Sequence, residues 1–256
     1  MNNSNVLIFC FSLLIFLSCK DGGNDQTSTS KDAEVKENKE LSEEALLDTV
    51  QKQTLKYFWD FAEPNSGMAR ERYHPNGDYA KNDPDIVTTG GSGFGLMAMI
   101  AGIERGFIPR DEAVQRLDKI ATFLEETPKY HGAFPHWING RTAGTQEFGS
   151  DSKDNGGDIV ETSFLAQGFI VVRQYLQDGN EEEKAVVAKF DKLWQNIDWD
   201  WYTNNKNGIF WHWSPDYEFE KNFMIEGYNE CLITYIMAAS SPQDAIKPEV
   251  YHQGWA

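Results

Sequence analysis

The chain has 256 residues and a formal net charge of −17 at pH 7, with 25% charged and 13% aromatic residues. Such an acidic protein lacks the basic surface that nucleic-acid binding requires, so nucleic acid is excluded as a partner. Residues 41–256 are enough to bury one sizeable core, and the charge selects no particular ligand for it.

The first 40 residues predict an export signal followed by a tether. The apolar run from Val6 to Leu17 has the length of a signal-peptide core and is too short to cross a bilayer as a helix. Cys19 follows in a pattern that resembles a lipobox, which predicts a signal at 1–19, lipidation at Cys19 and a lipid anchor in the outer membrane, facing the periplasm or the cell surface. An ordinary cleaved signal peptide with an incidental cysteine is the alternative. Residues 20–40 are polar and predict a disordered tether.

Hydrophobic periodicity predicts six helices in the rest of the chain. They span about 42–62, 92–105, 109–126, 158–176, 180–197 and 226–239. The first, third and fifth carry apolar residues on one face, which is typical of helices on the outside of a fold. The second, fourth and sixth are apolar nearly all round, which predicts that they are buried. Outer and inner helices therefore alternate.

The connections between these helices alternate in length. Inner helices lead to outer ones through the short turns 106–108 and 177–179, whereas the return connections 63–91, 127–157 and 198–225 are long. Long connections without regular structure are uncommon unless they are functional. All three lead into the N-terminal end of an inner helix, so we expect them on one face, with a site there.

Alternating inner and outer helical hairpins predict an all-α fold of the α/α-toroid type. A closed (α/α)6 toroid needs about twice this length of chain. Residues 41–256 supply about three hairpins and are therefore expected to be its N-terminal part. A compact array of six helices that closes on itself is the alternative.

Glycines at positions 90, 91, 93 and 95 end the first long connection. Glycines at the N-terminal end of a helix can form a phosphate-binding site, but the sequence has neither a P-loop motif nor a dinucleotide-binding fingerprint. Close packing of the buried helices explains the glycines better, so we expect no bound nucleotide.

Three carboxylates end the second long connection. Asp158 and Glu161 are three positions apart and share one face of the predicted helix, with Asp154 just before them. Asp158 as an N-cap with Glu161 at the third position is also close to a capping box, which needs no catalysis. The two interpretations carry equal weight at this point. His131, His136 and His212 lack the spacing of metal ligands, so no metal site is expected.

The third long connection is rich in aromatic residues, including Trp211 and Trp213. Aromatic faces stack on sugar rings while polar side chains bind the hydroxyls, although we expect about half of these rings to be core. Tyr228, Asn229 and Glu230 follow directly before an apolar run. Glu230 is expected at the mouth of a buried helix, on the same face as Glu226, where a carboxylate is costly unless it is paired or used.

Carboxylates from two inner helices among aromatic residues suit glycoside hydrolysis, in which one acid protonates the leaving oxygen and one base activates water or attacks carbon. The candidate catalytic residues are Asp154, Asp158, Glu161 and Glu230. The candidate sugar-binding residues are His136, Trp137, Trp211, Trp213, Tyr228 and Asn229. No serine elbow or Cys–His pair stands out, so acyl transfer is not expected.

From about residue 46 to residue 255 the sequence resembles glycoside hydrolase family 144, the bacterial endo-β-1,2-glucanases with a glucoamylase-like domain. The matching stretches are 57–61, 87–95, 131–137, 156–162 and 225–230. The resemblance implies an (α/α)6 toroid that hydrolyses β-1,2-glucan with inversion and without a cofactor. It also implies that Asp154, Asp158, Glu161 and Glu230 are the carboxylates that matter, with Glu161 or Asp158 as proton donor.

The sequence departs from the family pattern after Pro242, where Gln243-Asp244-Ala245 replaces a Thr-His-Pro-like stretch. Two other interpretations remain open. One is a surface glycan-binding lipoprotein that keeps the aromatic rim but has no turnover, and the other is an inactive truncated product.

Overall fold

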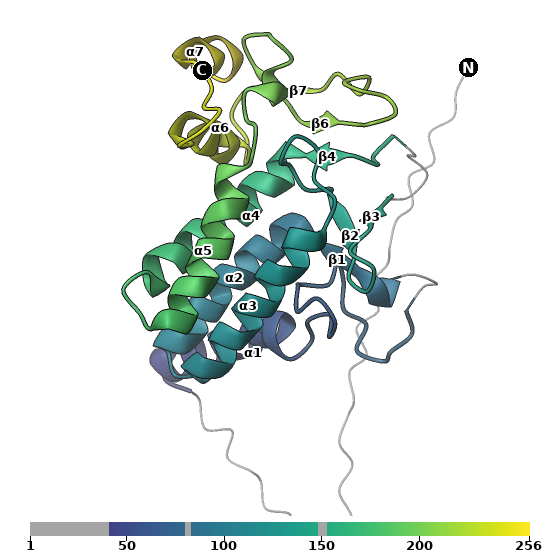
Figure 1. Ribbon diagram of the computed structural model, residues 1–256. Helices are drawn as coiled ribbons and strands as arrows, with labels where there is room; N and C mark the ends of the chain where they lie inside the picture. Colours follow the sequence, from purple (N-terminus) through teal and green to yellow (C-terminus); the bar gives the residue numbers. More distant parts are fainter. Residues whose placement is uncertain (1–40, 80–82, 148–152) are drawn as a thin grey trace, which may run out of the picture. The chain divides into compact units, whose positions relative to one another are not determined.

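The computed structural model describes residues 41–79, 83–147 and 153–256 (Figure 1). The predicted export signal with Cys19 and the predicted tether lie outside these residues and stay predictions. Within the described residues, no helix has both the length and the apolar character needed to cross a membrane.

Seven α-helices are present in the described residues, and the first five begin and end within three residues of their predicted limits. They are α1 (Glu43–Trp59), α2 (Thr89–Glu104), α3 (Arg110–Glu126), α4 (Ile159–Leu176), α5 (Glu181–Gln195), α6 (Leu232–Ser240) and α7 (Pro248–Gly254). Side chains at the predicted starts explain this agreement. Ser42 caps α1, and Asn180 caps α5 in a reciprocal capping box with Glu183.

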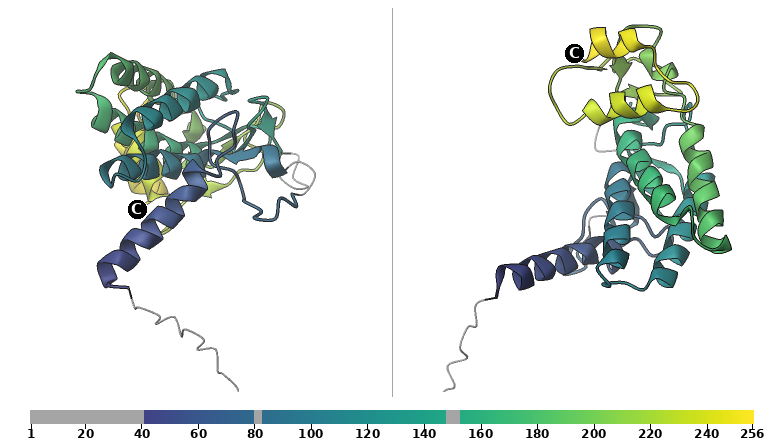
Figure 2. Two further views of the ribbon diagram at one scale, coloured as in Figure 1. Left: turned by 90° about the horizontal axis from the view of Figure 1, so that it is seen from below. Right: turned by 90° about the vertical axis from the view of Figure 1, so that its left-hand side faces the viewer.

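The helices pack in the alternating order that the sequence predicts. α2 packs against α4 and α4 against α6, while α1 covers α2, and α3 and α5 pack against each other outside. The predicted helical, toroid-like class is thus confirmed for the described residues. In Figure 2, the N-terminal part of α1 extends away from the other helices.

Glycines bring α2 and α4 into backbone contact. A Cβ atom on Gly93 would lie 2.2 Å from the carbonyl oxygen of Phe164, and one on Gly168 would lie 2.7 Å from the carbonyl oxygen of Gly93. No side chain fits in either place, because real Cβ atoms essentially never approach within 3.0 Å. The prediction that the glycines of the first long connection serve close helix packing is therefore confirmed for Gly93.

Seven short strands, none of them predicted, join the three long connections. They are β1 (Ile86–Thr88), β2 (Trp137–Asn139), β3 (Thr145–Gln146), β4 (Gly157–Asp158), β5 (Ile209–Phe210), β6 (His212–Trp213) and β7 (Met224–Ile225). β2 lies between β1 and β3, β4 pairs with β6, and β5 pairs with β7, all antiparallel.

These pairings bring the first connection to the second and the second to the third. The N–H of Thr89 donates to the carbonyl of His136 at 3.1 Å, and the N–H of Ile159 donates to the carbonyl of Trp211 at 3.0 Å. Both bonds lie where an inner helix begins. The expectation that the long connections share one face is therefore confirmed.

The prediction for the sixth helix is wrong in two respects. α6 begins at Leu232, six residues later than predicted, so Glu226 and Glu230 lie before the helix rather than on one of its faces. The helix is also not buried all round, because Ile236 is 48% exposed. On α1, part of the predicted apolar face is likewise open to solvent, with Leu47 60% and Val50 52% exposed.

Candidate active site

Three of the predicted carboxylates gather at the start of α4, around His136. The Nδ1 atom of His136 lies 3.1 Å from Oδ2 of Asp158 and 3.9 Å from Oδ2 of Asp154, and its Nε2 lies 3.8 Å from Oε1 of Glu161. His212, which the sequence suggested only as a poor metal candidate, lies 3.3 Å from Asp154 through its Nε2. Two histidines thus stand among three carboxylates.

Asp158 is fully buried and holds other groups in place. Its Oδ1 accepts the backbone N–H of Glu161 at 2.9 Å, which makes it the N-cap of α4. Its Oδ2 accepts the indole N–H of Trp211 at 2.6 Å. Since both oxygens are engaged and no part of the side chain is open, Asp158 acts on its neighbours rather than on a ligand.

Glu161 is the carboxyl of this cluster that reaches open space. Its Oε2 accepts the backbone N–H of Gly90 at 2.9 Å, where α2 begins. A Cβ atom on residue 90 would lie 2.4 Å from that oxygen, so only glycine allows the bond. Burial raises the pKa of Glu161, and the negative charge of Asp158 raises it further, while His136 and the Gly90 N–H oppose the change.

His136 is the basic group at the centre of this cluster. Burial by itself would lower the pKa of His136, but the contact with Asp158 and the charges of Asp158, Glu161 and Asp154 outweigh burial and raise it. The imidazole stacks on the indole of Trp137 at 3.6 Å between centroids and 7° between planes. Trp137 is itself buried, so it supports His136 and has little surface for a sugar.

A cavity of about 520 Å³ opens beside Glu161. It is lined by His136, Val160, Glu161, Trp211, Lys221, Phe223, Ile225, Glu230 and Cys231. This volume is in the usual range of ligand pockets, roughly 300–1,000 Å³. Burial raises the pKa of the Cys231 thiol to about 11, so the thiol is protonated at neutral pH and is a poor nucleophile.

The position of Glu230 corrects one expectation. The residue lines the cavity as predicted, but it lies in an exposed turn before α6 and not at the mouth of a buried helix. Of its predicted neighbours, Tyr228 is fully exposed and outside the lining. Asn229 folds back on its own turn, with its amide donating to the carbonyl of Glu226 and its Oδ1 accepting from the N–H of Cys231.

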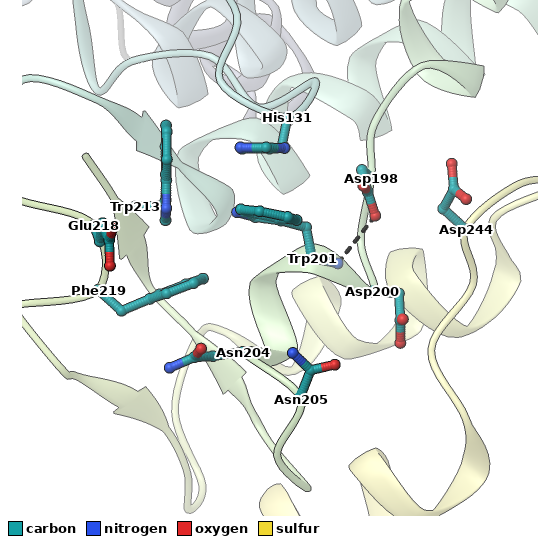
Figure 3. A pocket seen from close by; sticks show the side chains of 10 residues that line it. All are labelled: His131, Asp198, Asp200, Trp201, Asn204, Asn205, Trp213, Glu218, Phe219 and Asp244. Atoms are coloured by element: carbon teal, nitrogen blue, oxygen red, sulfur yellow. Dashed lines mark hydrogen bonds between the residues drawn. The ribbon is translucent and has the colours of Figure 1, made fainter. Parts of the chain in front are cut away.

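Of the aromatic residues predicted to bind sugar, Trp211 lines this cavity, and the ammonium of Lys221 lies over its ring at 4.6 Å from the centroid. Trp213 lines a different cavity, shown in Figure 3. Sequence reasoning missed Val160, Lys221 and Phe223, because no motif or spacing marks a lone lining residue. Among the described parts of the chain, no group of three or more His, Cys, Asp or Glu side chains is placed to hold a metal ion.

Comparison with known proteins shows that this chain is similar to β-1,2-glucan hydrolases. A family model described as "Protein of unknown function (DUF3131)" matches residues 49–202, and one described as "Putative glucoamylase" matches residues 222–256. An exo β-1,2-glucooligosaccharide sophorohydrolase (non-reducing end) from Parabacteroides distasonis is 48% identical over 218 residues. The solved endo-β-1,2-glucanase from Chitinophaga pinensis, in complex with sophorotriose and glucose, is 55% identical with a TM-score of 0.82. The chain belongs to glycoside hydrolase family 144.

The chain spans only part of these family 144 relatives. The match covers 84% of this chain but 29% of the sophorohydrolase, and 85% of this chain but 51% of the Chitinophaga pinensis structure. A solved β-1,2-glucanase from Parabacteroides distasonis is 47% identical, with a TM-score of 0.79. Its match covers 85% of this chain and 30% of the glucanase chain. The residues that match family 144 make up about half or less of each relative.

Proposed function

We propose that this chain hydrolyses β-1,2-linked glucan by carboxylate acid–base chemistry. The observation that carries the proposal is the setting of the Glu161 carboxyl group. This group faces a cavity, its pKa is raised, and its hydrogen bond to the Gly90 N–H fixes its orientation. A carboxyl group with a raised pKa beside a ligand cavity suits the donation of a proton to a glycosidic oxygen. The names of the relatives supply the linkage, because they are a β-1,2-glucanase and a sophorohydrolase.

Two carboxylates of this cavity take the two roles that hydrolysis needs. Glu161 gives its proton to the oxygen that leaves as the C1–O bond breaks, and Glu230 removes a proton from the water that attacks C1. Attack from the face opposite the leaving oxygen inverts the anomeric carbon. Asp158 and His136 orient Glu161 and set its charge, and Asp154 holds His136 and His212, so all three are positioning residues.

The wider architecture and location belong to the same proposal. Helices α2, α4 and α6 form one side of an (α/α)6 toroid, supported by their order of packing and by a TM-score of 0.82 to a relative of about twice the length. The protein is exported and held at the outer membrane through a lipid on Cys19, where it meets polysaccharide outside the cytoplasm. The lipobox-like sequence before Cys19 supports this location.

Sugar release from a panel of glucans tests the proposed function. Linear β-1,2-glucan, β-1,3-glucan and mixed-linkage glucan are incubated separately with the protein, and the products are separated by chromatography. Short β-1,2-linked oligosaccharides from the first polymer alone are the expected result. Release from either of the other polymers at a comparable rate contradicts the proposed linkage, and no release from a folded protein contradicts hydrolysis.

A further inference from the structure

A second cavity of about 580 Å³ lies among the residues of the third long connection. It shares no lining residue with the cavity of Glu161. β6 lies near both, because Trp213 lines the second cavity while Trp211, just before the strand, lines the first. The catalytic proposal makes no use of this second cavity.

An aromatic stack forms one wall of the second cavity (Figure 3). The rings of His131 and Trp201 are parallel, 3.6 Å apart between centroids and 10° between planes. Trp213 stands edge-on to both, at 90° to His131 and 80° to Trp201. Trp201 is 40% exposed, although an indole is costly to leave in water.

The backbone holds this stack in place from both sides. The N–H of Trp201 donates to Oδ1 of Asp198 at 3.0 Å, and the N–H of Asp198 donates to the carbonyl of His131 at 3.1 Å. Gly132 has a φ of +79°, a backbone conformation that favours glycine, and a Cβ there would lie 2.0 Å from the carbonyl oxygen of Asn196. Burial lowers the pKa of His131, so the stacked ring is neutral at pH 7. The open indole is thus fixed rather than mobile.

Two amides lie across from the stack, on the side of Trp201 away from His131 (Figure 3). Asn204 and Asn205 have φ values of 50° and 55°, in the left-handed region, and both line the cavity. The described residues supply no hydrogen-bond partner for either side-chain amide. Amides that offer a donor and an acceptor to an open cavity suit a ligand with hydroxyl groups.

The charges around the cavity indicate which class of ligand it can bind. The carboxylates of Asp198, Asp200, Glu218 and Asp244 line it, and no lysine or arginine does. An anionic ligand would meet four negative charges and no positive one, whereas sugar hydroxyls can donate to carboxylates. These acids are not grouped to hold a metal, since the described residues contain no such set of three.

We propose that this cavity is a second carbohydrate-binding site, in which the open face of Trp201 stacks on a glucose ring and Asn204, Asn205 and Asp200 bind its hydroxyls. The choice of a neutral β-1,2-linked gluco-oligosaccharide as the ligand rests on the proposed function. The site binds glucan without cleaving it, because the acid and the base of the proposed reaction both line the other cavity.

Indole N–H signals in a ¹⁵N–¹H NMR spectrum report on the two cavities separately. The protein has eight tryptophans, and the signals of Trp201 and Trp211 are identified by their loss in Trp201→Ala and Trp211→Phe. A β-1,2-linked glucotetraose is titrated into the full chain carrying Glu161→Gln, so that the ligand survives. We expect the Trp201 signal to move with a saturable dependence on ligand concentration.

Two further variants separate recognition from folding. Asn204→Gly keeps the left-handed backbone and removes only the amide, so we expect the affinity measured at Trp201 to fall about threefold to tenfold. Tyr217→Ala removes an exposed aromatic ring that lines neither cavity, and we expect it to leave that affinity unchanged. Equal losses in the two variants contradict the proposed contacts.

The outcomes distinguish this site from the hydrolytic proposal. A shift of the Trp201 signal supports the second site even if the unmutated chain releases no sugar from glucan, in which case only the hydrolytic proposal fails. A shift confined to Trp211, or no shift at all, overturns the second site. Movement of the Trp201 signal with calcium chloride but not with sugar also overturns it, because the cavity is then a cation site.

Discussion

The side chain of Glu161 joins the starts of two helices, because its Oε2 accepts the N–H of Gly90 in α2 while its own backbone N–H is held by Asp158 at the start of α4. Burial and the charge of Asp158 raise the pKa of Glu161, and His136 lowers it. The pKa of Glu161 thus depends on its neighbours Asp158 and His136 as well as on its own burial.

His136→Gln tests this dependence on pH. Glu161 must be protonated to act, so activity is present below its pKa and is lost as the pH rises through it. Removal of His136 removes a charge that lowers this pKa, so the alkaline limb of the activity profile moves to higher pH. The measurement is kcat/KM against pH for both proteins. His252→Gln changes an exposed histidine that does not line the cavity, and its profile should match that of the unmutated protein. A limb that stays in place or moves to lower pH in His136→Gln contradicts the proposed role of Glu161.

At the scale of elements, the contact between α2 and α4 sets the position of the site, because Gly90 and Glu161 lie on these two helices. Gly93→Ala places a Cβ atom 2.2 Å from the carbonyl oxygen of Phe164 and forces the helices apart. We expect a loss of about 1–3 kcal/mol in the free energy of unfolding, measured by urea denaturation.

Gly144→Ala is the matched control for this substitution. The nearest atom to its new Cβ is Oγ1 of Thr142 at 3.4 Å, an ordinary contact, so the free energy should change by less than about 0.5 kcal/mol. Similar values for the two variants would contradict the close packing of α2 on α4.

Some elements could be predicted from the sequence and others could not. The first five helices carry long periodic patterns and clear caps such as Ser42 and Asn180, which is why their limits agree with the structure. The strands have two or three residues each, too few for any alternation of polar and apolar residues to be seen. The late start of α6 was missed because Gly227 and Asn229 form a turn inside a stretch that otherwise continues an apolar pattern.

The same reasons explain the outcome for the candidate site. The proximity of Asp158 and Glu161 could be predicted from their spacing of three residues at the start of one helix. The structure shows that Asp158 is the N-cap of this helix. The assignment of Trp213 and Trp211 to separate cavities depends on how the third connection folds, which no local pattern encodes.

At the scale of the whole molecule, the described surface has an apolar region on α1. Leu47 and Val50 are 60% and 52% exposed on this helix, whereas Leu55 is 7% exposed. Exposed apolar side chains gathered on one helix favour association in solution.

Leu47→Gln with Val50→Gln tests this consequence. We expect the double variant to associate less in sedimentation experiments and to keep its thermal stability, because both side chains are already largely in water. Leu55→Gln, on the same helix but buried, should instead lower the unfolding temperature. Unchanged association in the double variant would rule out this surface as the cause.

The central claim is that Glu161 protonates the leaving oxygen, and Glu161→Gln measured on two substrates tests it most directly. One substrate is linear β-1,2-glucan, and the other is a β-1,2-gluco-oligosaccharide with a nitrophenyl group, which leaves without a proton. We expect kcat to fall by about 10²–10⁴-fold on the glucan and far less on the nitrophenyl substrate. Equal losses on both substrates would contradict the assignment of Glu161 as the acid. The assignment would also be contradicted if Glu230→Gln, rather than Glu161→Gln, lost activity on the glucan and kept it on the nitrophenyl substrate.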